Sequence, residues 1–338
     1  KSTVSALIAH LLRSAGKRTA LVGNIGTPLL ETMDWSEQPE FWVIEMSSYQ
    51  TFEAVRPEVA MMLNFYPEHL DWHGSLQAYF EDKSALITKS QARHVVLNDE
   101  APGVAALADG LEAEVHWFNT SVGWHAKGHT LYRGDTAVLD LRELPMPGQH
   151  NAGNVCAALT AIDALALHAA ALAPAAKHFR PLPHRLQSLG EKNGIRYVND
   201  SISTTPFASI AALGCFTAQP VAILVGGYDR GLDWDAFAEY VAVHPPKAII
   251  AMGQNGARIA ECLRGINTPG FHLSEAADLS DAVQQAQQAL PEGGVVLLSP
   301  GAPSFGVYAD YVARGRHFAE LAGFDPNAIS KIPGLGLG

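Results

Sequence analysis

The sequence has few cysteines and fewer basic than acidic residues. Its 338 residues include three cysteines, Cys156, Cys215 and Cys262, whose spacing fits neither a disulfide framework nor a metal-binding pair. This cysteine usage is typical of a protein from a reducing compartment. Lysine and arginine number 23 against 34 aspartates and glutamates, and the formal net charge of −11 argues against nonspecific binding to nucleic acid. A small anionic substrate stays compatible with this charge, because a local basic site can lie on an acidic protein.

The sequence also lacks a long uninterrupted apolar run. Its most apolar stretch, residues 155–173, contains Asp163 and His168, so it predicts a buried helix instead of a membrane span. No signal peptide is recognisable, and we expect a cytoplasmic protein with no membrane partner. The hydrophobic content of 48% is ample for packed cores, and the length predicts about two domains.

Strand-like and helix-like patterns alternate through the first half of the chain. Short apolar runs predict strands at 18–22, 41–44 and 59–63. Helical spacing is found at 3–15, 76–89, 101–108 and 151–170. This alternation predicts an α/β unit whose mostly parallel sheet is covered by helices, with ligands bound beyond the carboxyl ends of the strands.

A second α/β unit follows Pro181 and Pro183, which break any continuing helix. Strands are predicted at 195–198, 222–225, 248–251 and 295–298. Helices are predicted from Pro206 and near 234–243, 255–264, 277–290 and 306–322. The expected fold is a Rossmann-like, doubly wound α/β domain.

The first three residues, Lys1, Ser2 and Thr3, precede an amphipathic helix as the last residues of a phosphate-binding P-loop do. A helix N-terminus offers free N–H groups and partial positive charge, the lysine adds a cation, and the hydroxyl can ligate Mg²⁺. The glycines of such a motif would precede Lys1. The alternative is an ordinary serine-capped helix after a lysine.

Further candidates lie at or after the predicted strand ends. Glu45 directly follows four apolar residues, where a Walker-B acid would hold Mg²⁺. His69 lies in the segment after the third strand, and Lys83 lies on an amphipathic helix. The alternatives are a solvent-facing acid, a surface loop histidine and a lysine that extends its amine to solvent.

Taken together and in order, these motifs resemble those of the Mur ligases, the ATP-dependent amino-acid ligases of bacterial cell-wall synthesis. The resemblance is closest to the glutamate-adding branch and extends over essentially the whole chain. The motifs that carry it are Lys1-Ser2-Thr3, Gly23-Asn24-Ile25-Gly26, the segments 45–50 and 64–71, Lys83, and His150-Asn151-Ala152-Gly153-Asn154.

The resemblance implies a central ATPase domain at 1–178, truncated at its P-loop, and an amino-acid-binding C-terminal domain at 179–338. It implies that ATP and Mg²⁺ are used to join glutamate to UDP-N-acetylmuramoyl-L-alanine through an acyl phosphate, in peptidoglycan precursor synthesis. A monomer is expected. The absence of an Asp-Asn-Pro-Arg motif favours glutamate over diaminopimelate as the amino acid.

Site residues are implied by the same resemblance. Nucleotide contacts are assigned to Lys1, Ser2, Thr3, Asn151, Asn154, Arg185 and Asp200. Metal ligands are Ser2, Glu45, His69 and Lys83, the last as a carbamylated lysine, and the catalytic residues are Lys1, His69 and Lys83. The muramoyl substrate is assigned to Asn24 and Ser47, and glutamate to Thr204, Arg230, Ser304, Tyr311 and Arg314.

Two positions depart from the family pattern and concern the handedness of glutamate. Ile202 stands where a lysine is common, and Arg230 replaces a pocket lysine. A guanidinium does not place its donors where an ammonium does, which leaves the handedness of glutamate open. The Asp-Ser-Ile-Ser-Thr-Thr-Pro motif at 200–206 resembles that of a branch that adds L-glutamate, so we favour L-glutamate, with D-glutamate as the alternative. From another class, the Gly226-Gly227 turn after a strand suggests an NAD-dependent oxidoreductase, although G-x-G-x-x-G is absent.

Overall fold

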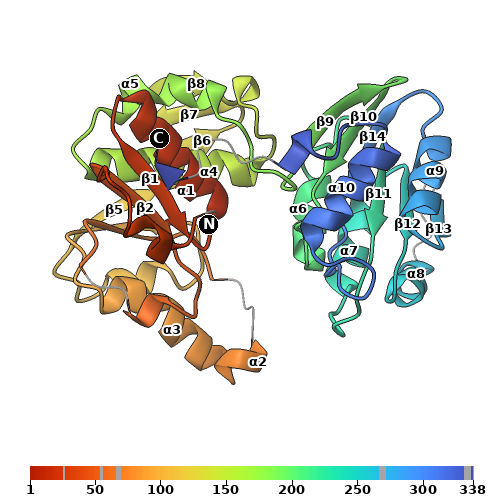
Figure 1. Cartoon of the computed structure of the whole chain (residues 1–338), viewed down its shortest axis with the longest axis horizontal. Helices are drawn as coiled ribbons and strands as arrows, with labels where there is room; N and C mark the ends of the chain where they lie inside the picture. The colour runs from red at the N-terminus through yellow and green to blue at the C-terminus, as the bar shows by residue number, and fades with distance from the viewer. Residues whose placement is uncertain (26, 54–55, 66–69, 266–271, 331–335, 338) are drawn as a thin grey trace. The chain divides into compact units, whose positions relative to one another are not determined.

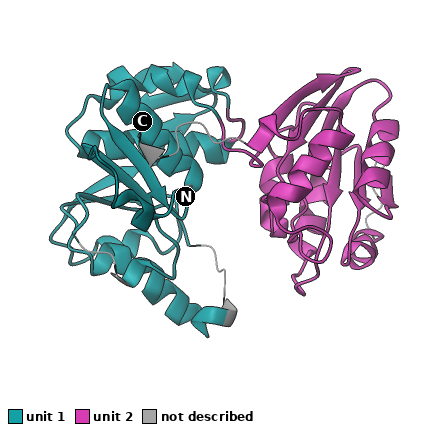
Figure 2. Cartoon of the chain, viewed as in Figure 1, with its two compact units in different colours: residues 1–145, 149–180, 333–338 teal, residues 146–148, 181–332 magenta. Residues whose placement is uncertain are grey.

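The computed structural model describes residues 1–25, 27–53, 56–65, 70–265, 272–330 and 336–337. The chain divides into two compact units (Figure 2). Unit 1 comprises residues 1–145 and 149–180 together with the C-terminal strand, and unit 2 comprises residues 146–148 and 181–332. Among the described residues, no helix is both long and apolar enough to cross a bilayer.

Unit 1 contains two sheets (Figure 1). In the smaller one, β1 (Thr19–Gly23) pairs in parallel with β2 (Phe41–Glu45) and antiparallel with β15 (Gly336–Leu337). The larger sheet runs in sequence order from β3 to β8, parallel as far as β6 and antiparallel beyond it. Its strands are β3 (Val59–Met62), β4 (His94–Asn98), β5 (Glu114–Phe118), β6 (Trp124–Lys127), β7 (Thr130–Arg133) and β8 (Thr136–Asp140).

The helices of unit 1 bury apolar faces against these sheets. α1 and α4 pack on each other, and Leu7, Leu11 and Leu159 are fully buried. The α-helices are α1 (Ser2–Ser14), α2 (Leu70–His73), α3 (Leu76–Thr88), α4 (Gln149–Ala164) and α5 (Ala169–Leu172). The 3₁₀ turns are η1 (Leu29–Thr32), η2 (Thr51–Glu53), η3 (Ala105–Ala108), η4 (Leu141–Glu143) and η5 (Ala173–His178).

Unit 2 is a doubly wound α/β fold, as predicted. Its sheet has the order β13-β12-β11-β14-β10-β9, parallel except for the edge strand β9. Every residue of β11 is buried, because helices cover both faces of the sheet. The strands are β9 (Gln187–Lys192), β10 (Ile195–Asn199), β11 (Val221–Val225), β12 (Ala248–Ala251), β13 (His272–Glu275) and β14 (Gly294–Leu298).

Two hydrophobic clusters of unit 2 correspond to the two faces of this sheet. One includes Phe237, Ile259 and Leu297, and the other includes Val283, Leu298 and Phe318. The helices that supply them are α6 (Pro206–Leu213), α7 (Asp235–Val243), α8 (Gly256–Leu263), α9 (Leu279–Ala289) and α10 (Tyr311–Leu321), and the turn η6 (Ala328–Ser330) follows.

The fold class is confirmed, and three predicted helices were too long. Residues 101–108 form only the 3₁₀ turn η3, since Pro102 and the left-handed Gly103 precede it. The helix expected from 306 begins at Tyr311, after Gly306 at φ 83°, and Asp310 caps it. The stretch 151–170 is divided by Ala166, whose φ is 57°, into α4 and α5.

Candidate functional site

The start of α1 and the ends of β1 and β2 form one edge of unit 1. Lys1 occupies the N-cap position and Ser2 opens the helix. A helix packed against the parallel strand that follows it runs back along that strand, so the start of α1 lies toward the carboxyl ends of the small sheet. Gly23 and Glu45 are register partners at those ends. The predicted phosphate-binding residues and the predicted metal ligand Glu45 therefore share an edge.

Glu45 is a buried carboxylate, and one of its oxygens has no hydrogen-bond partner among the described residues. Its side chain is 4% exposed, Asn24 Nδ2 donates to Oε1 over 3.3 Å, and Oε2 has no hydrogen-bond partner among the described residues. Gly23, at φ 100°, is required here because a Cβ would lie 2.4 Å from the carbonyl oxygen of Glu45. A buried, unsatisfied carboxylate oxygen is costly unless a cation or donor reaches it. Together with the Ser2 hydroxyl, this oxygen fits the hard-oxygen donor set that Mg²⁺ prefers.

The remaining predicted residues of unit 1 lie on three further segments. The backbone N–H and Oγ of Ser47 both donate to Gln50 Oε1, over 3.0 and 2.9 Å. On α3, Lys83 Nζ donates to Tyr79 Oη at 2.7 Å and lies over the rings of Tyr79 and Phe65. His69 lies outside the described residues.

Near the start of α4, two predicted nucleotide contacts form a hydrogen bond with each other. Asn154 Nδ2 donates to Oδ1 of the buried Asn151 at 3.0 Å. Two amides that the sequence did not single out lie at the carboxyl ends of β4 and β5, where Asn119 Nδ2 donates to Asn98 Oδ1 at 2.9 Å. Asn98 is the last residue of β4 and Asn119 follows the last residue of β5, each directly after a buried apolar residue. A polar residue at a strand end was the sequence signal that could have identified them.

Sequence reasoning also missed a buried hydrogen-bonded relay, Ser48–His73–Asp82. Ser48 Oγ lies 3.0 Å from His73 Nε2, and His73 Nδ1 lies 2.8 Å from Asp82 Oδ2. Ser48 follows Ser47 and Asp82 precedes Lys83, so the relay connects two segments that carry predicted site residues. Adjacency to those motifs was the only sequence signal. Ser48 is 8% exposed, which suits a positioning role better than a nucleophile.

In unit 2, Asp200 lies at the carboxyl end of β10. Its Oδ2 accepts from Ser299 Oγ at 2.8 Å and its Oδ1 accepts from the backbone N–H of Leu186 at 3.1 Å. Burial raises the pKa of Asp200 to about 6, against the opposing effects of these hydrogen bonds and of Arg185. Arg185 has a buried Nε with no hydrogen-bond partner among the described residues.

The guanidinium of Arg314 is held by three oxygens, two of which belong to Ser201, the residue that follows Asp200 in the chain. Its Nε donates to Ser201 Oγ at 3.1 Å, and its Nη2 donates to the carbonyl oxygens of Ser201 and Ala302 at 2.8 and 3.0 Å. The side chain is 2% exposed, Nη1 has no partner, and no acidic side chain of the described residues forms an ion pair with it. Burial lowers the pKa of Arg314 to about 10. A buried cation without a counter-charge suits an anionic ligand.

The loops after β10, β11 and β14 are bonded to one another and to α10. Ser201 Oγ donates to the carbonyl oxygen of Tyr311 at 2.8 Å, and the backbone N–H of Tyr228 donates to the carbonyl oxygen of Pro303 at 2.9 Å. These bonds bring together segments that carry predicted glutamate contacts: Thr204, Arg230, Ser304, Tyr311 and Arg314. Ser304 is buried, Thr204 is half-buried, and Arg230 is exposed.

The exposed Arg230 extends from a loop with a fixed base. Asp229 receives two hydrogen bonds from the Arg258 guanidinium, at 2.6 and 3.1 Å, and one from the backbone N–H of Gly231. These contacts lower the pKa of Asp229. Arg230 itself forms no ion pair with the described residues.

Comparisons with known proteins agree with this architecture. Residues 1–162 match the Mur ligase middle domain, and residues 184–301 match the Mur ligase, glutamate ligase domain. A UDP-N-acetylmuramoyl-L-alanine--L-glutamate ligase of Xanthomonas campestris pv. campestris is 59% identical over the whole of this chain, which covers 73% of that protein.

Two solved structures share the fold at low identity. MurF from Acinetobacter baumannii has a TM-score of 0.70 at 16% identity, over 89% of this chain and 72% of its own. The MurF ligase of Thermotoga maritima, solved with ADP, has a TM-score of 0.67 at 18% identity, over 95% of this chain and 76% of its own.

Proposed function

The chain belongs to the Mur ligase family, and from this premise we propose that it joins L-glutamate to UDP-N-acetylmuramoyl-L-alanine at the expense of ATP. The observation that carries the proposal is the 59% identity, over the whole chain, to a ligase of that name. The carboxylate of the substrate's alanine residue attacks the γ-phosphorus of ATP, and ADP leaves. The glutamate amine then attacks the acyl phosphate, and phosphate leaves as the amide forms. We expect a cytoplasmic monomer.

In unit 1, the proposed roles follow from the residues at the carboxyl edge. Lys1, the first-turn hydroxyls of Ser2 and Thr3 and the free N–H groups of α1 bind the phosphates. Ser2 and the unpartnered oxygen of Glu45 would hold Mg²⁺, which supplies charge stabilisation during phosphoryl transfer. Asn24 and Ser47 orient the muramoyl substrate, and Asn151 and Asn154 contact the nucleotide.

Lys83 and His69 complete the proposed metal ligands. An ammonium cannot ligate a cation, so this role requires Lys83 to carry a carbamate, whose oxygens are carboxylate-like. Loss of the amine's positive charge would also remove its interaction with the Tyr79 and Phe65 rings. The mass of the intact protein in bicarbonate buffer, compared with Lys83→Arg, tests this directly: an unmodified Lys83 in active enzyme would exclude it from the metal site.

In unit 2, the proposed amino-acid site lies beside Arg314. A glutamate carboxylate would supply the counter-charge that this buried guanidinium lacks, with Thr204, Ser304 and Tyr311 as further contacts. Arg185 and Asp200 are assigned to the nucleotide.

The preference for L-glutamate rests on the similarity to ligases named for L-glutamate and on Arg230. Inverting the α-carbon while both carboxylates stay anchored swings the amine away from the acyl phosphate. A misplacement of about 1 Å can cost roughly a hundredfold in rate, so one anchor must move between enzymes of opposite preference. Arg230, exposed on a loop with a fixed base, is the proposed moved anchor.

The test compares the two glutamate enantiomers with ATP and UDP-N-acetylmuramoyl-L-alanine, measuring phosphate release and product. We expect release to require both substrates and to be faster with L-glutamate. A faster reaction with D-glutamate would show that the enzyme prefers the opposite enantiomer. ATP hydrolysis at the same rate with and without the two substrates would exclude ligation. Arg230→Lys should raise the KM for glutamate, with Arg264→Lys as an exposed arginine control in the same unit.

The oxidoreductase alternative is not retained. In a dinucleotide fold the helix starts directly after the glycine turn and places its N-terminus at the pyrophosphate. Here α7 begins at Asp235, well after the end of β11 at Val225. The Gly226-Gly227 turn instead allows close packing, since a Cβ on Gly227 would lie 2.4 Å from the carbonyl oxygen of Pro303.

A further inference from the structure

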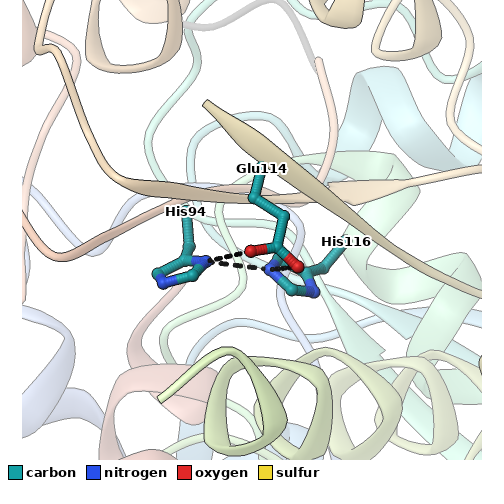
Figure 3. Close-up of side chains that lie close together, drawn as sticks. All are labelled: His94, Glu114 and His116. Atoms are coloured by element: carbon teal, nitrogen blue, oxygen red, sulfur yellow. Dashed lines mark hydrogen bonds and ion pairs between the residues drawn. The ribbon is translucent and has the colours of Figure 1, made fainter. Parts of the chain in front are cut away.

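Two histidines and a glutamate converge at the amino ends of β4 and β5 (Figure 3). His94 and Glu114 are the first residues of these strands and are register partners, and His116 lies two residues beyond Glu114 on the same face. The amino ends are opposite the carboxyl ends that carry Asn98 and Asn119. The cluster is therefore separate from the candidate ligase residues, and nothing in the proposed reaction uses it.

The ligand atoms of this cluster are spaced as a tetrahedral metal requires. His94 Nδ1 lies 3.1 Å from His116 Nε2 and 3.4 Å from Glu114 Oε2, and His116 Nε2 lies 3.7 Å from Glu114 Oε1. Zinc bonds of about 2.0–2.1 Å at the tetrahedral angle place ligand atoms roughly 3.3–3.4 Å apart. In Figure 3 the carboxylate and the facing nitrogens of both rings are directed toward one another. Small side-chain rotations suffice to equalise the three separations.

The surroundings favour an ordered site over three independent surface groups. The histidine side chains are 16% and 22% exposed, and neighbouring parallel strands fix their spacing. The other ring nitrogen of His94, Nε2, lies 4.0 Å from Glu58 Oε1. Metal-bound histidines commonly direct their free N–H to such a carboxylate, which orients the ring. Glu114 is 67% exposed, so the cluster can be reached from solvent.

We propose that His94, Glu114 and His116 bind a divalent transition metal, with zinc as the preferred ion and water as the fourth ligand. Two imidazole nitrogens select Zn²⁺ over Mg²⁺ and Ca²⁺, which prefer oxygen. The ion would tie the amino ends of β4 and β5 together. It would be distinct from the magnesium that the proposed ligase reaction uses.

The test is titration of the full chain with Zn²⁺, and with Co²⁺ as a spectroscopic probe, without nucleotide and in excess Mg²⁺ to occupy oxygen sites. We expect one Zn²⁺ per chain, a rise in the Tm and the intense visible absorption of tetrahedral Co²⁺. Glu114→Gln should weaken binding at least tenfold, and His94→Gln and His116→Gln should abolish the Co²⁺ spectrum. His129→Gln, an exposed histidine at the β6–β7 turn, is the matched control.

A hydrogen bond between the two rings is the competing explanation of the 3.1 Å contact. It predicts no stoichiometric metal, and that result would overturn the proposal. So would equal Zn²⁺ binding by the wild type and the histidine variants. The Tm of each variant without metal reports whether it folds, and Glu114→Gln alters an exposed side chain, so a general loss of structure would not be mistaken for loss of ligands. Ligase activity is not a readout, so failure here leaves the proposed function intact.

Discussion

At the scale of single residues, unit 2 holds a buried cation that no described acid neutralises. Arg314 donates three hydrogen bonds to Ser201 and Ala302, so the orientation of its guanidinium is fixed before any ligand binds. Fixed orientation matters because the planar guanidinium sets the direction of every N–H bond, including those of Nη1. The remaining donor, Nη1, is the group that a substrate carboxylate would meet.

Arg314→Lys keeps the charge but loses the fork-shaped donor geometry. We expect the KM for glutamate to rise about tenfold or more, because the ammonium cannot satisfy the Ser201 and Ala302 oxygens and still reach a carboxylate. The KM for ATP should change less. Steady-state kinetics measures both, and Arg316→Lys, an exposed arginine on the same helix, is the control. An unchanged glutamate KM in folded Arg314→Lys would remove this residue from the amino-acid site.

The raised pKa of Asp200 predicts that the unfolding free energy depends on pH. The folded protein holds the Asp200 proton up to about pH 6, whereas the unfolded chain releases it near its ordinary value of 3.8. Between these values Asp200 therefore lowers the unfolding free energy as the pH rises. His184 acts oppositely: burial lowers its pKa to about 4, so the fold loses stability as the pH falls from 6.5 toward 4.

Asp200→Asn isolates the carboxyl contribution, because the His184 contribution is common to both proteins. Asparagine can keep both hydrogen bonds, since the Ser299 hydroxyl can rotate to accept. The difference in unfolding free energy between the variant and the wild type should shift in favour of the variant by about 2–3 kcal/mol as the pH rises from 4 to 7. Urea unfolding at several pH values measures the difference, and a difference that is flat with pH would show that Asp200 ionises normally.

At the scale of elements, the Ser48–His73–Asp82 relay ties the segment after β2 to α3. Thr51 Oγ1 adds a second tie by donating to the carbonyl oxygen of Asp82 at 2.7 Å. The two elements carry Ser47 and Lys83, so their relative placement bears on the muramoyl and metal sites. A buried histidine with both ring nitrogens engaged fixes that placement more firmly than apolar contact alone.

His73→Ala should destabilise the fold by about 2–4 kcal/mol, because it opens a cavity and leaves the buried Ser48 hydroxyl without its hydrogen-bond partner. We also expect a higher KM for the muramoyl substrate. Ser48→Ala and Asp82→Asn should be non-additive in a double-mutant cycle, since both act through the same ring. His168→Ala, an exposed histidine on the same unit, is the control. Additive effects would contradict a connected relay.

At the scale of the whole molecule, the chain consists of two units with separate cores. Val95 and Leu97 belong to a buried cluster of unit 1, and Phe237 belongs to one of unit 2. Unit 1 has two sheets and unit 2 has one, each with its own covering helices, so each unit can unfold as a cooperative block.

Calorimetry of the full chain should show two transitions that respond to different substitutions. Leu97→Ala should lower one Tm and Phe237→Ala the other, each by an amount on the order of 10 °C, from the usual cost of a core truncation. Both side chains are fully buried, so the two variants are matched. If both substitutions shifted a single common transition, the units would be one cooperative structure.

The fold class and the family follow from local features of the sequence. Strand-like apolar runs alternating with helical periodicity are local patterns, and local propensity is enough to predict a parallel sheet with covering helices. The ordered motifs from Lys1 to Asn154 could also be recognised from the sequence, because nearly all of them are short runs of neighbouring residues. Helix ends were less so: the start of α10 at Tyr311 depended on a left-handed Gly306 and on the Asp310 cap.

Which side chains contact one another depends on the tertiary fold. Ser48 and Asp82 are joined through His73, Arg314 is joined to Ser201 across more than a hundred residues, and His94 faces His116 because β4 and β5 pair in one register. The orphan oxygen of Glu45 likewise depends on what surrounds it. Such contacts follow from strand order and burial, and these arise from packing between elements that are distant in sequence. No local pattern encodes them, because the same residues in another register would point to the opposite face.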